Sequence, residues 1–115
     1  MCIRDSSRTV LNGSKNIPNE GSLDMEIPFE EMRKNTLNNF KMASDILKNS
    51  KRKDLKKMKV KFKRGDKISE YPYWNMINGP IADAIWHCGQ VVSFRRASGN
   101  PFNSKASVFS GKLRE

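Results

Sequence analysis

The most informative segment of the chain is residues 79–90, which read Gly-Pro-Ile-Ala-Asp-Ala-Ile-Trp-His-Cys-Gly-Gln. The segment belongs to a predicted helix that follows Tyr71–Trp74 and ends near Ala97. Pro80 removes a backbone hydrogen bond and clashes with the preceding turn, so we expect the helix to bend or restart around Asn78–Pro80. Its apolar face is predicted to consist of Ile81, Ala84, Ile85, Cys88, Val91 and Val92.

Three polar residues of this segment are spaced so that they lie on the same side of a helix. Asp83, His87 and Gln90 stand at i, i+4 and i+7, so their side chains project along one stripe of the helix. A carboxylate and an imidazole one turn apart can present two ligands to a divalent metal, with the glutamine as a hydrogen-bond partner behind them. The alternative is a histidine that is satisfied in the core and oriented by Asp83. Gly89 would let another helix or a ligand approach closely.

The same segment resembles the last helix of the DinB-like superfamily. The hallmark of that helix is His-x-x-x-His-Arg-Gly-Gln, and this chain has Asp-x-x-x-His-Cys-Gly-Gln. His87, Gly89 and Gln90 match, whereas Asp83 stands in place of the first histidine and Cys88 in place of the arginine. The following Ser-Phe-Arg-Arg-Ala-Ser-Gly-Asn-Pro resembles a bacterial branch of the superfamily. The resemblance covers nearly all of residues 7–115, although only the helix motif is specific.

The resemblance implies a four-helix bundle in which one histidine of the second helix and two of the fourth hold a divalent metal, commonly nickel or zinc. Carried over, His87 and Asp83 become metal ligands and Gln90 supports them, with aspartate favouring a harder ion such as manganese or iron. Relatives include metal-dependent thiol transferases and isomerases. The implied function is therefore divalent-metal binding, with hydrolysis or thiol transfer on a small-molecule substrate. Whether the chain is an enzyme stays open, and no nucleophile with a paired base is visible.

The remaining pattern predicts a mainly α fold, a partial four-helix bundle with a short β-hairpin between its last two helices. Residues 7–12 look like the end of a helix stopped by Gly13, and residues 14–27 like a surface connection. A long helix opens at Pro28, carries acidic residues in its first turn and ends near Asn49. Its apolar stripe is predicted to contain Phe29, Met32, Leu37, Phe40, Ala43, Ile46 and Leu47.

Residues 51–67 hold ten basic residues and two aspartates, which is +8 of the formal net charge of +10. Met58, Val60 and Phe62 alternate with lysines, so we expect a lysine-studded edge strand, a turn at Arg64–Asp66 and a return strand over residues 67–71. The favoured interpretation is a solvated hairpin. The alternative function is a non-enzymatic module that binds a polyanion or nucleic acid through the basic hairpin of residues 51–67, with Lys57, Lys59, Lys61, Lys63 and Arg64 as its binding residues. Nucleic acid is the less expected partner because the one aromatic residue of the block, Phe62, points inward and no base-reading motif accompanies it.

The first six residues, Met-Cys-Ile-Arg-Asp-Ser, match the translation of a sequencing-library adapter and are interpreted as an artefact. Residues 7–115 would then be the carboxy-terminal part of one domain that lacks its first helix and most of its second. The second-helix histidine would precede Arg8, so the site would be incomplete and the chain unstable or prone to aggregate.

Composition excludes several classes of protein. The 115 residues suffice for one small domain, and no apolar run approaches the ~18 residues of a membrane span. Two cysteines and one histidine exclude a disulfide scaffold and a Cys/His zinc site. The default compartment is the cytoplasm, with a signal peptide left open, and a homodimeric scaffold is a third reading of the function. In the irregular end of the chain, residues 102–115, the candidate anchors are Phe102, Val108 and Phe109.

Overall fold

The computed structural model describes residues 2–21, 26–107 and 110–115. The helical elements are α1 (Cys2–Ser14), α2 (Phe29–Asn49), α3 (Arg52–Leu55), the π-helical turn η1 (Ile77–Ile81) and α4 (Ala82–Ala97). The strands are β1 (Asn19–Glu20), β2 (Lys59–Arg64), β3 (Lys67–Pro72), β4 (Ala106–Ser107) and β5 (Lys112–Leu113). The chain is mainly helical with two small sheets, which confirms the coarse fold class.

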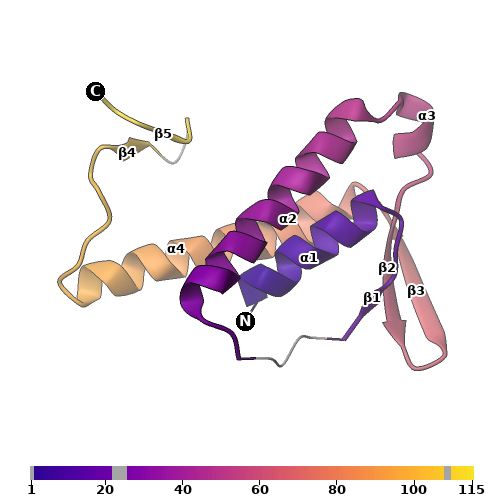
Figure 1. Cartoon of the computed structure of the whole chain (residues 1–115), viewed down its shortest axis with the longest axis horizontal. Helices are drawn as coiled ribbons and strands as arrows, with labels where there is room; N and C mark the ends of the chain where they lie inside the picture. Colours follow the sequence, from indigo (N-terminus) through magenta and orange to yellow (C-terminus); the bar gives the residue numbers. More distant parts are fainter. Residues whose placement is uncertain (1, 22–25, 108–109) are drawn as a thin grey trace.

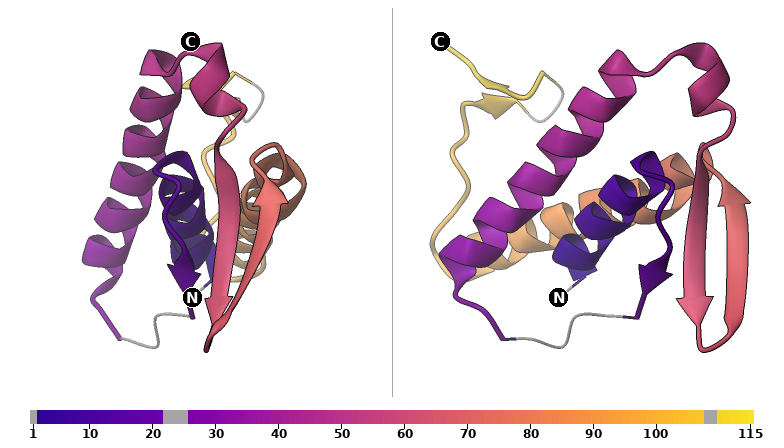
Figure 2. Two further views of the ribbon diagram at one scale, coloured as in Figure 1. Left: turned by 90° about the vertical axis from the view of Figure 1, so that its right-hand side faces the viewer. Right: turned by 45° about the vertical axis from the view of Figure 1, so that its right-hand side comes forward.

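Helix α1 is the centre of the arrangement. It contacts α2, α4, η1 and β2, and it lies between α2 on one side and α4 with the hairpin on the other (Figures 1 and 2). Residues 2–6 are part of this helix, and Arg4 and Ser6 are buried in it. The described elements include three long helices, α1, α2 and α4.

Helix α2 begins and ends where the sequence predicts. Pro28 precedes its first residue, and Glu30 and Glu31 place negative charge beside the free amide groups of the first turn. Ala43 is buried, and Phe40 and Ile46 pack against the core. The expected stripe is nevertheless too wide, because Phe29 and Leu37 are 69% and 55% exposed. Helix α1 covers one side of α2 only, and these two side chains lie outside that contact.

The end of α1 differs from the prediction. Gly13 does not stop the helix but lies inside it, and the reversal occurs at Asn16, whose φ is 59°. The Asn16 amide donates to the Gly13 carbonyl at 3.0 Å and the Ile17 amide to the Asn12 carbonyl at 2.8 Å, which is the Schellman pattern. Gly13 is needed for packing, because a Cβ there would collide with the Met76 methyl group.

Gly13 of α1 and Gly89 of α4 provide a matched test of this packing. Alanine in a helix interior is favoured over glycine by about 1 kcal/mol, and nothing lies within 4 Å of a Cβ built at Gly89. We expect Gly89→Ala to raise the free energy of unfolding by about 0.5–1 kcal/mol. Gly13→Ala should lower it by about 1 kcal/mol, since overpacking against buried Met76 costs about 1–3 kcal/mol. Urea unfolding followed by circular dichroism at 222 nm measures both, and equal stabilisation by the two substitutions would contradict the packing role of Gly13.

The predicted hairpin is confirmed. β2 and β3 pair antiparallel with Arg64 opposite Lys67, so the loop is Gly65-Asp66, and Gly65 supplies the positive φ of 58° that such a loop uses. Val60 is fully buried, as the period-two pattern requires. The Phe62 and Tyr71 rings meet edge to face with centroids 6.1 Å apart.

The surroundings of the hairpin were not predicted. Residues 14–27 were expected to be an irregular connection, but β1 lies there and pairs parallel to β2, with Asn19 opposite Phe62. β2 is therefore the central strand of the sheet and not an edge strand. The buried Asn19 amide group also donates to the Lys61 carbonyl at 3.1 Å. The short helix α3, before β2, was likewise missed.

The core is small. Its buried residues are Val10, Leu11, Ala43, Val60 and Met76, and the side chains packed against them are Phe40, Ile46, Phe62, Tyr73 and Ile81. Burial raises the pKa of the Tyr73 hydroxyl above its ordinary value, because the charged form would lose hydration.

The chain bends before α4 as predicted, but α4 buries a different face from the predicted one. The bend lies in η1, where Gly79 has non-helical φ and ψ of −115° and −106° just before Pro80. Ala84 is buried and Ile81 packs against the core. The rest of the predicted apolar face is wrong in part. Three residues that were predicted to be buried are exposed: Ile85, Cys88 and Val91. The half-buried positions of α4 instead include Asp83, His87 and Gln90, because α1 packs on their side of the helix.

Beyond α4, the chain forms the small β4–β5 pair (Figure 1). The Arg95 guanidinium lies 5.7 Å from the centroid of the Phe102 ring, so Phe102 contacts the end of α4 while staying partly exposed. The other two candidate anchors, Val108 and Phe109, lie outside the described residues. Within the described ranges, no helix is both long and apolar enough to cross a membrane.

Candidate functional site

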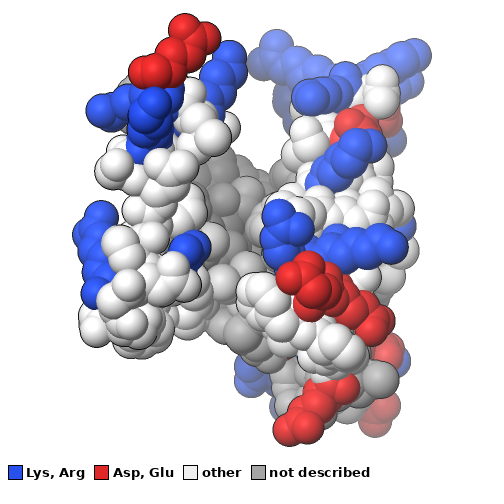
Figure 3. Space-filling model, turned by 60° about the vertical axis from the view of Figure 1, so that its left-hand side comes forward, with Lys and Arg blue, Asp and Glu red and all other residues white. Residues whose placement is uncertain are grey.

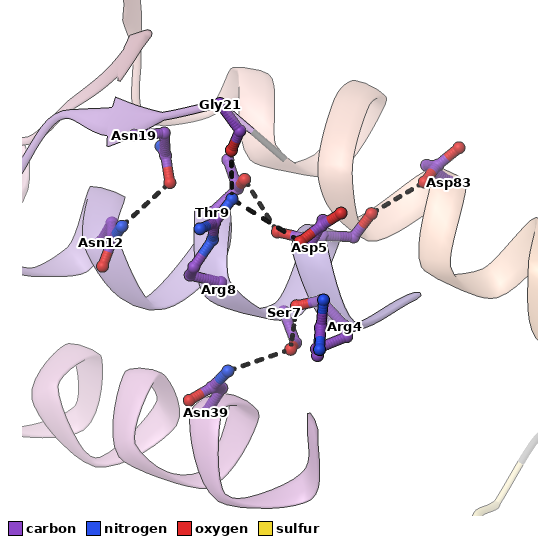
Figure 4. Close-up of polar contacts among 11 residues, drawn as sticks. Arg4, Asp5, Ser7, Arg8, Thr9, Asn12, Asn19, Gly21, Asn39 and Asp83 are labelled. Atoms are coloured by element: carbon purple, nitrogen blue, oxygen red, sulfur yellow. Dashed lines mark hydrogen bonds and ion pairs between the residues drawn. The ribbon is translucent and has the colours of Figure 1, made fainter. Parts of the chain in front are cut away.

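The predicted metal ligands meet at the interface of α1 and α4. The Ser6 hydroxyl of α1 donates to Asp83 Oδ2 at 2.7 Å, and Asp83 Oδ1 lies 3.5 Å from His87 Nε2. Figure 4 shows Asp83 reaching from α4 toward α1. The His87 and Asp83 side chains are 29% and 41% exposed, so an ion can reach them from solvent. The structure thus brings Asp83 and His87 together as their i, i+4 spacing predicts.

Gln90 holds the other side of the imidazole. His87 Nδ1 and Gln90 Oε1 are 2.6 Å apart. Because an amide oxygen only accepts hydrogen bonds, Nδ1 carries the proton and donates it, which leaves Nε2 as the lone-pair nitrogen of neutral His87. That nitrogen faces Asp83.

The order of the three groups excludes one kind of chemistry. The carboxylate of Asp83 lies between the Ser6 hydroxyl and the imidazole of His87. In a hydrolytic triad the imidazole lies next to the hydroxyl and takes its proton. His87 is therefore not placed to take the proton of the Ser6 hydroxyl.

The donor set fits a metal ion only in part. Two donors about 2.0–2.1 Å from a tetrahedral ion are about 3.4 Å apart, close to the 3.5 Å between Asp83 Oδ1 and His87 Nε2. Over the part of the chain that the structure describes, however, no three His, Cys, Asp or Glu residues come together in a metal-binding group. Asp83 and His87 are thus two strong donors, and the third group beside them is the weakly coordinating Ser6 hydroxyl.

Ser6 was missed by the sequence analysis. Because residues 1–6 match an adapter sequence, the sequence pattern gives no signal for Ser6 as a site residue. The next residue, Ser7, is fully buried on the other side of α1, where its hydroxyl donates to the Arg4 carbonyl at 2.7 Å and accepts from the Asn39 amide of α2 at 3.2 Å (Figure 4). The first two turns of α1 thus contact both neighbouring helices through polar groups.

The lysines predicted to bind a polyanion do not act as one set. Lys61 and Lys63 form ion pairs with Glu70 and Glu20, at 3.8 and 3.1 Å. Lys59 is half-buried, whereas Lys57, two residues before β2, and Arg64, at its end, are exposed. Acidic neighbours therefore offset the charge in the middle of the strand.

Comparison of the chain with family models, with curated proteins and with solved structures finds no match. The features that bear on function are therefore the contacts of Asp83, His87 and Gln90 and the distribution of charge. Both are local features of the described residues.

Proposed function

We propose that Asp83 and His87 bind a divalent metal ion in a helical domain of the DinB-like kind. The observation that carries the proposal is the 3.5 Å approach of Asp83 Oδ1 to His87 Nε2, with Gln90 hydrogen-bonded behind the ring. A carboxylate oxygen and an unprotonated imidazole nitrogen are both acceptors and repel each other. A divalent metal ion between them accepts a lone pair from each and removes that repulsion.

The residues present define the chemistry that a bound ion would find. Asp83 and His87 would supply one oxygen and one nitrogen, a set that suits nickel, zinc, manganese or iron. Gln90 orients the imidazole, the role that outer hydrogen-bond partners have in metal sites. Such an ion supplies Lewis-acid chemistry, which suits hydrolysis or thiol transfer on a small-molecule substrate.

The ligand assignment is tested by removing the imidazole. In a Cys2→Ser/Cys88→Ser background, which removes both thiols, calorimetric titration with Zn²⁺ and Mn²⁺ is expected to show one site that His87→Ala abolishes. Gln90→Ala should weaken binding about 10- to 100-fold without changing the stoichiometry. Metal stoichiometry that is unchanged by His87→Ala would show that the assignment is wrong.

A gain of affinity provides an independent check. Ser6→Cys is nearly isosteric and places a thiolate ligand next to Asp83, so the Zn²⁺ affinity should rise at least about tenfold, or about 1.4 kcal/mol. Ser7→Cys is the matched control, because the Ser7 hydroxyl contacts Asn39 of α2 and not Asp83. Equal gains from the two substitutions would contradict the placement of the site.

A further inference from the structure

A cluster of exposed basic side chains lies where α2 ends and α3 begins. We call residues 48–57 the α3 corner. Its one acidic residue is Asp54. Its six basic residues are all exposed: Lys48, Lys51, Arg52, Lys53, Lys56 and Lys57. The corner shares residues 51–57 with the basic block predicted from the sequence, but of the five residues predicted to bind a polyanion it contains only Lys57.

None of these six side chains has a carboxylate partner among the described residues. The ion pairs formed by Lys and Arg in those ranges include Arg8–Asp5, Lys41–Asp45, Lys61–Glu70 and Lys63–Glu20, and none of them involves the corner. Of the three acidic side chains of α2, Glu30 and Glu31 occupy the first turn at its other end, and Asp45 is paired with Lys41. A helix of 21 residues is about 31 Å long, several times the screening length of about 8 Å at physiological salt. Figure 3 shows this separation, with acidic side chains toward the lower right and basic ones at the upper right.

We propose that the α3 corner binds the phosphate backbone of double-stranded nucleic acid without reading its sequence. Clustered exposed Lys and Arg side chains release the counterions condensed on a duplex, which is the main source of non-specific affinity. Residues 48–57 contain no aromatic side chain on which unpaired bases could stack. Their apolar residue beyond α2, Leu55, is half-buried, so the corner presents little apolar surface for insertion into a membrane.

The salt dependence of binding is the diagnostic quantity. If four to six cations contact phosphates, the logarithm of the association constant should fall by about 4–5 units per tenfold rise in salt. Fluorescence anisotropy of a labelled 24-base-pair duplex, titrated with the full chain between 50 and 200 mM KCl, measures this slope. Each lost phosphate contact lowers the salt slope by about one unit, so the triple variant Lys53→Gln/Lys56→Gln/Lys57→Gln should have a slope about three units shallower. Its binding at 100 mM KCl should be at least about thirtyfold weaker.

The matched control removes three charges elsewhere. Arg33→Gln/Lys34→Gln/Lys112→Gln alters exposed residues of α2 and β5 outside the corner and changes the net charge equally, so its slope should stay within half a unit of that of the unsubstituted chain. Circular dichroism at 222 nm confirms that both variants retain their helices. Equal losses in the two variants, or no binding of the duplex at 50 mM KCl, would overturn the proposal. So would tighter binding of a single strand of the same length, or of phosphatidylserine vesicles, than of the duplex.

Discussion

The purified chain is expected to self-associate at micromolar concentration, and three substitutions on α4 are expected to suppress this association. Trp86 and Phe94 are each 68% exposed, and Ile85 is 66% exposed. Burying a large apolar side chain contributes about 1.5–3 kcal/mol, so the triple variant Ile85→Gln/Trp86→Gln/Phe94→Gln removes at least about 4 kcal/mol of driving force. The concentration at which association begins should therefore rise by more than about 100-fold.

The measurement is light scattering and size-exclusion chromatography over a concentration series. Ala82→Gln/Ser93→Gln is the control, because both residues are exposed on the same helix and neither contributes a large apolar surface. Association should persist in the control. An unsubstituted chain that stays monomeric at about 100 μM, with a cooperative thermal transition and a native near-ultraviolet dichroism spectrum, would refute the prediction.

The dimensions of the molecule support the same expectation. The radius of gyration is 15.9 Å, whereas a compact domain of this length has about 13 Å. Figure 1 shows why, since the second half of α4 and the β4–β5 pair extend away from α1 and α2. The side chains of this half of α4 thus lack the cover that α1 gives to Ala84.

The second large effect concerns the centre of the core. Val60 has no exposed surface and packs with Val10 and Met76, so Val60→Asp would bury a carboxylate among apolar groups. The cost of several kcal/mol is comparable with the 5–15 kcal/mol by which domains are stable. In the Ile85→Gln/Trp86→Gln/Phe94→Gln background, we expect this substitution to abolish the cooperative thermal transition and the near-ultraviolet signal.

Ile68→Asp is the matched control for Val60→Asp. Ile68 lies on the adjacent strand β3 and is 53% exposed, so the same chemical change should cost less than about 1 kcal/mol. Retention of a cooperative transition in the Val60→Asp variant would show that Val60 does not occupy the core.

Much of the local structure could be predicted because its causes lie within a few residues of one another. Pro28 and the acidic first turn locate the start of α2, and alternation around Val60 locates β2. Pro80 locates the bend before α4. The contact of Asp83 with His87 and Gln90 belongs to the same class, since i, i+3 and i+4 neighbours on a helix meet whatever the helix packs against.

What the helices pack against could be decided only in three dimensions. Apolar residues of α4 occur on several faces of the helix, so its sequence pattern did not identify the face that is buried. Contact with α1 turned Ala84 and His87 inward and left Ile85 exposed. The approach of Ser6 to Asp83, across 77 positions of the chain, arises from that same contact. The role of Gly13 also depends on a distant segment, because Met76, which packs against it, directly precedes η1. Short-range periodicity therefore determined the elements of this protein, whereas burial between distant segments determined which of their faces meet.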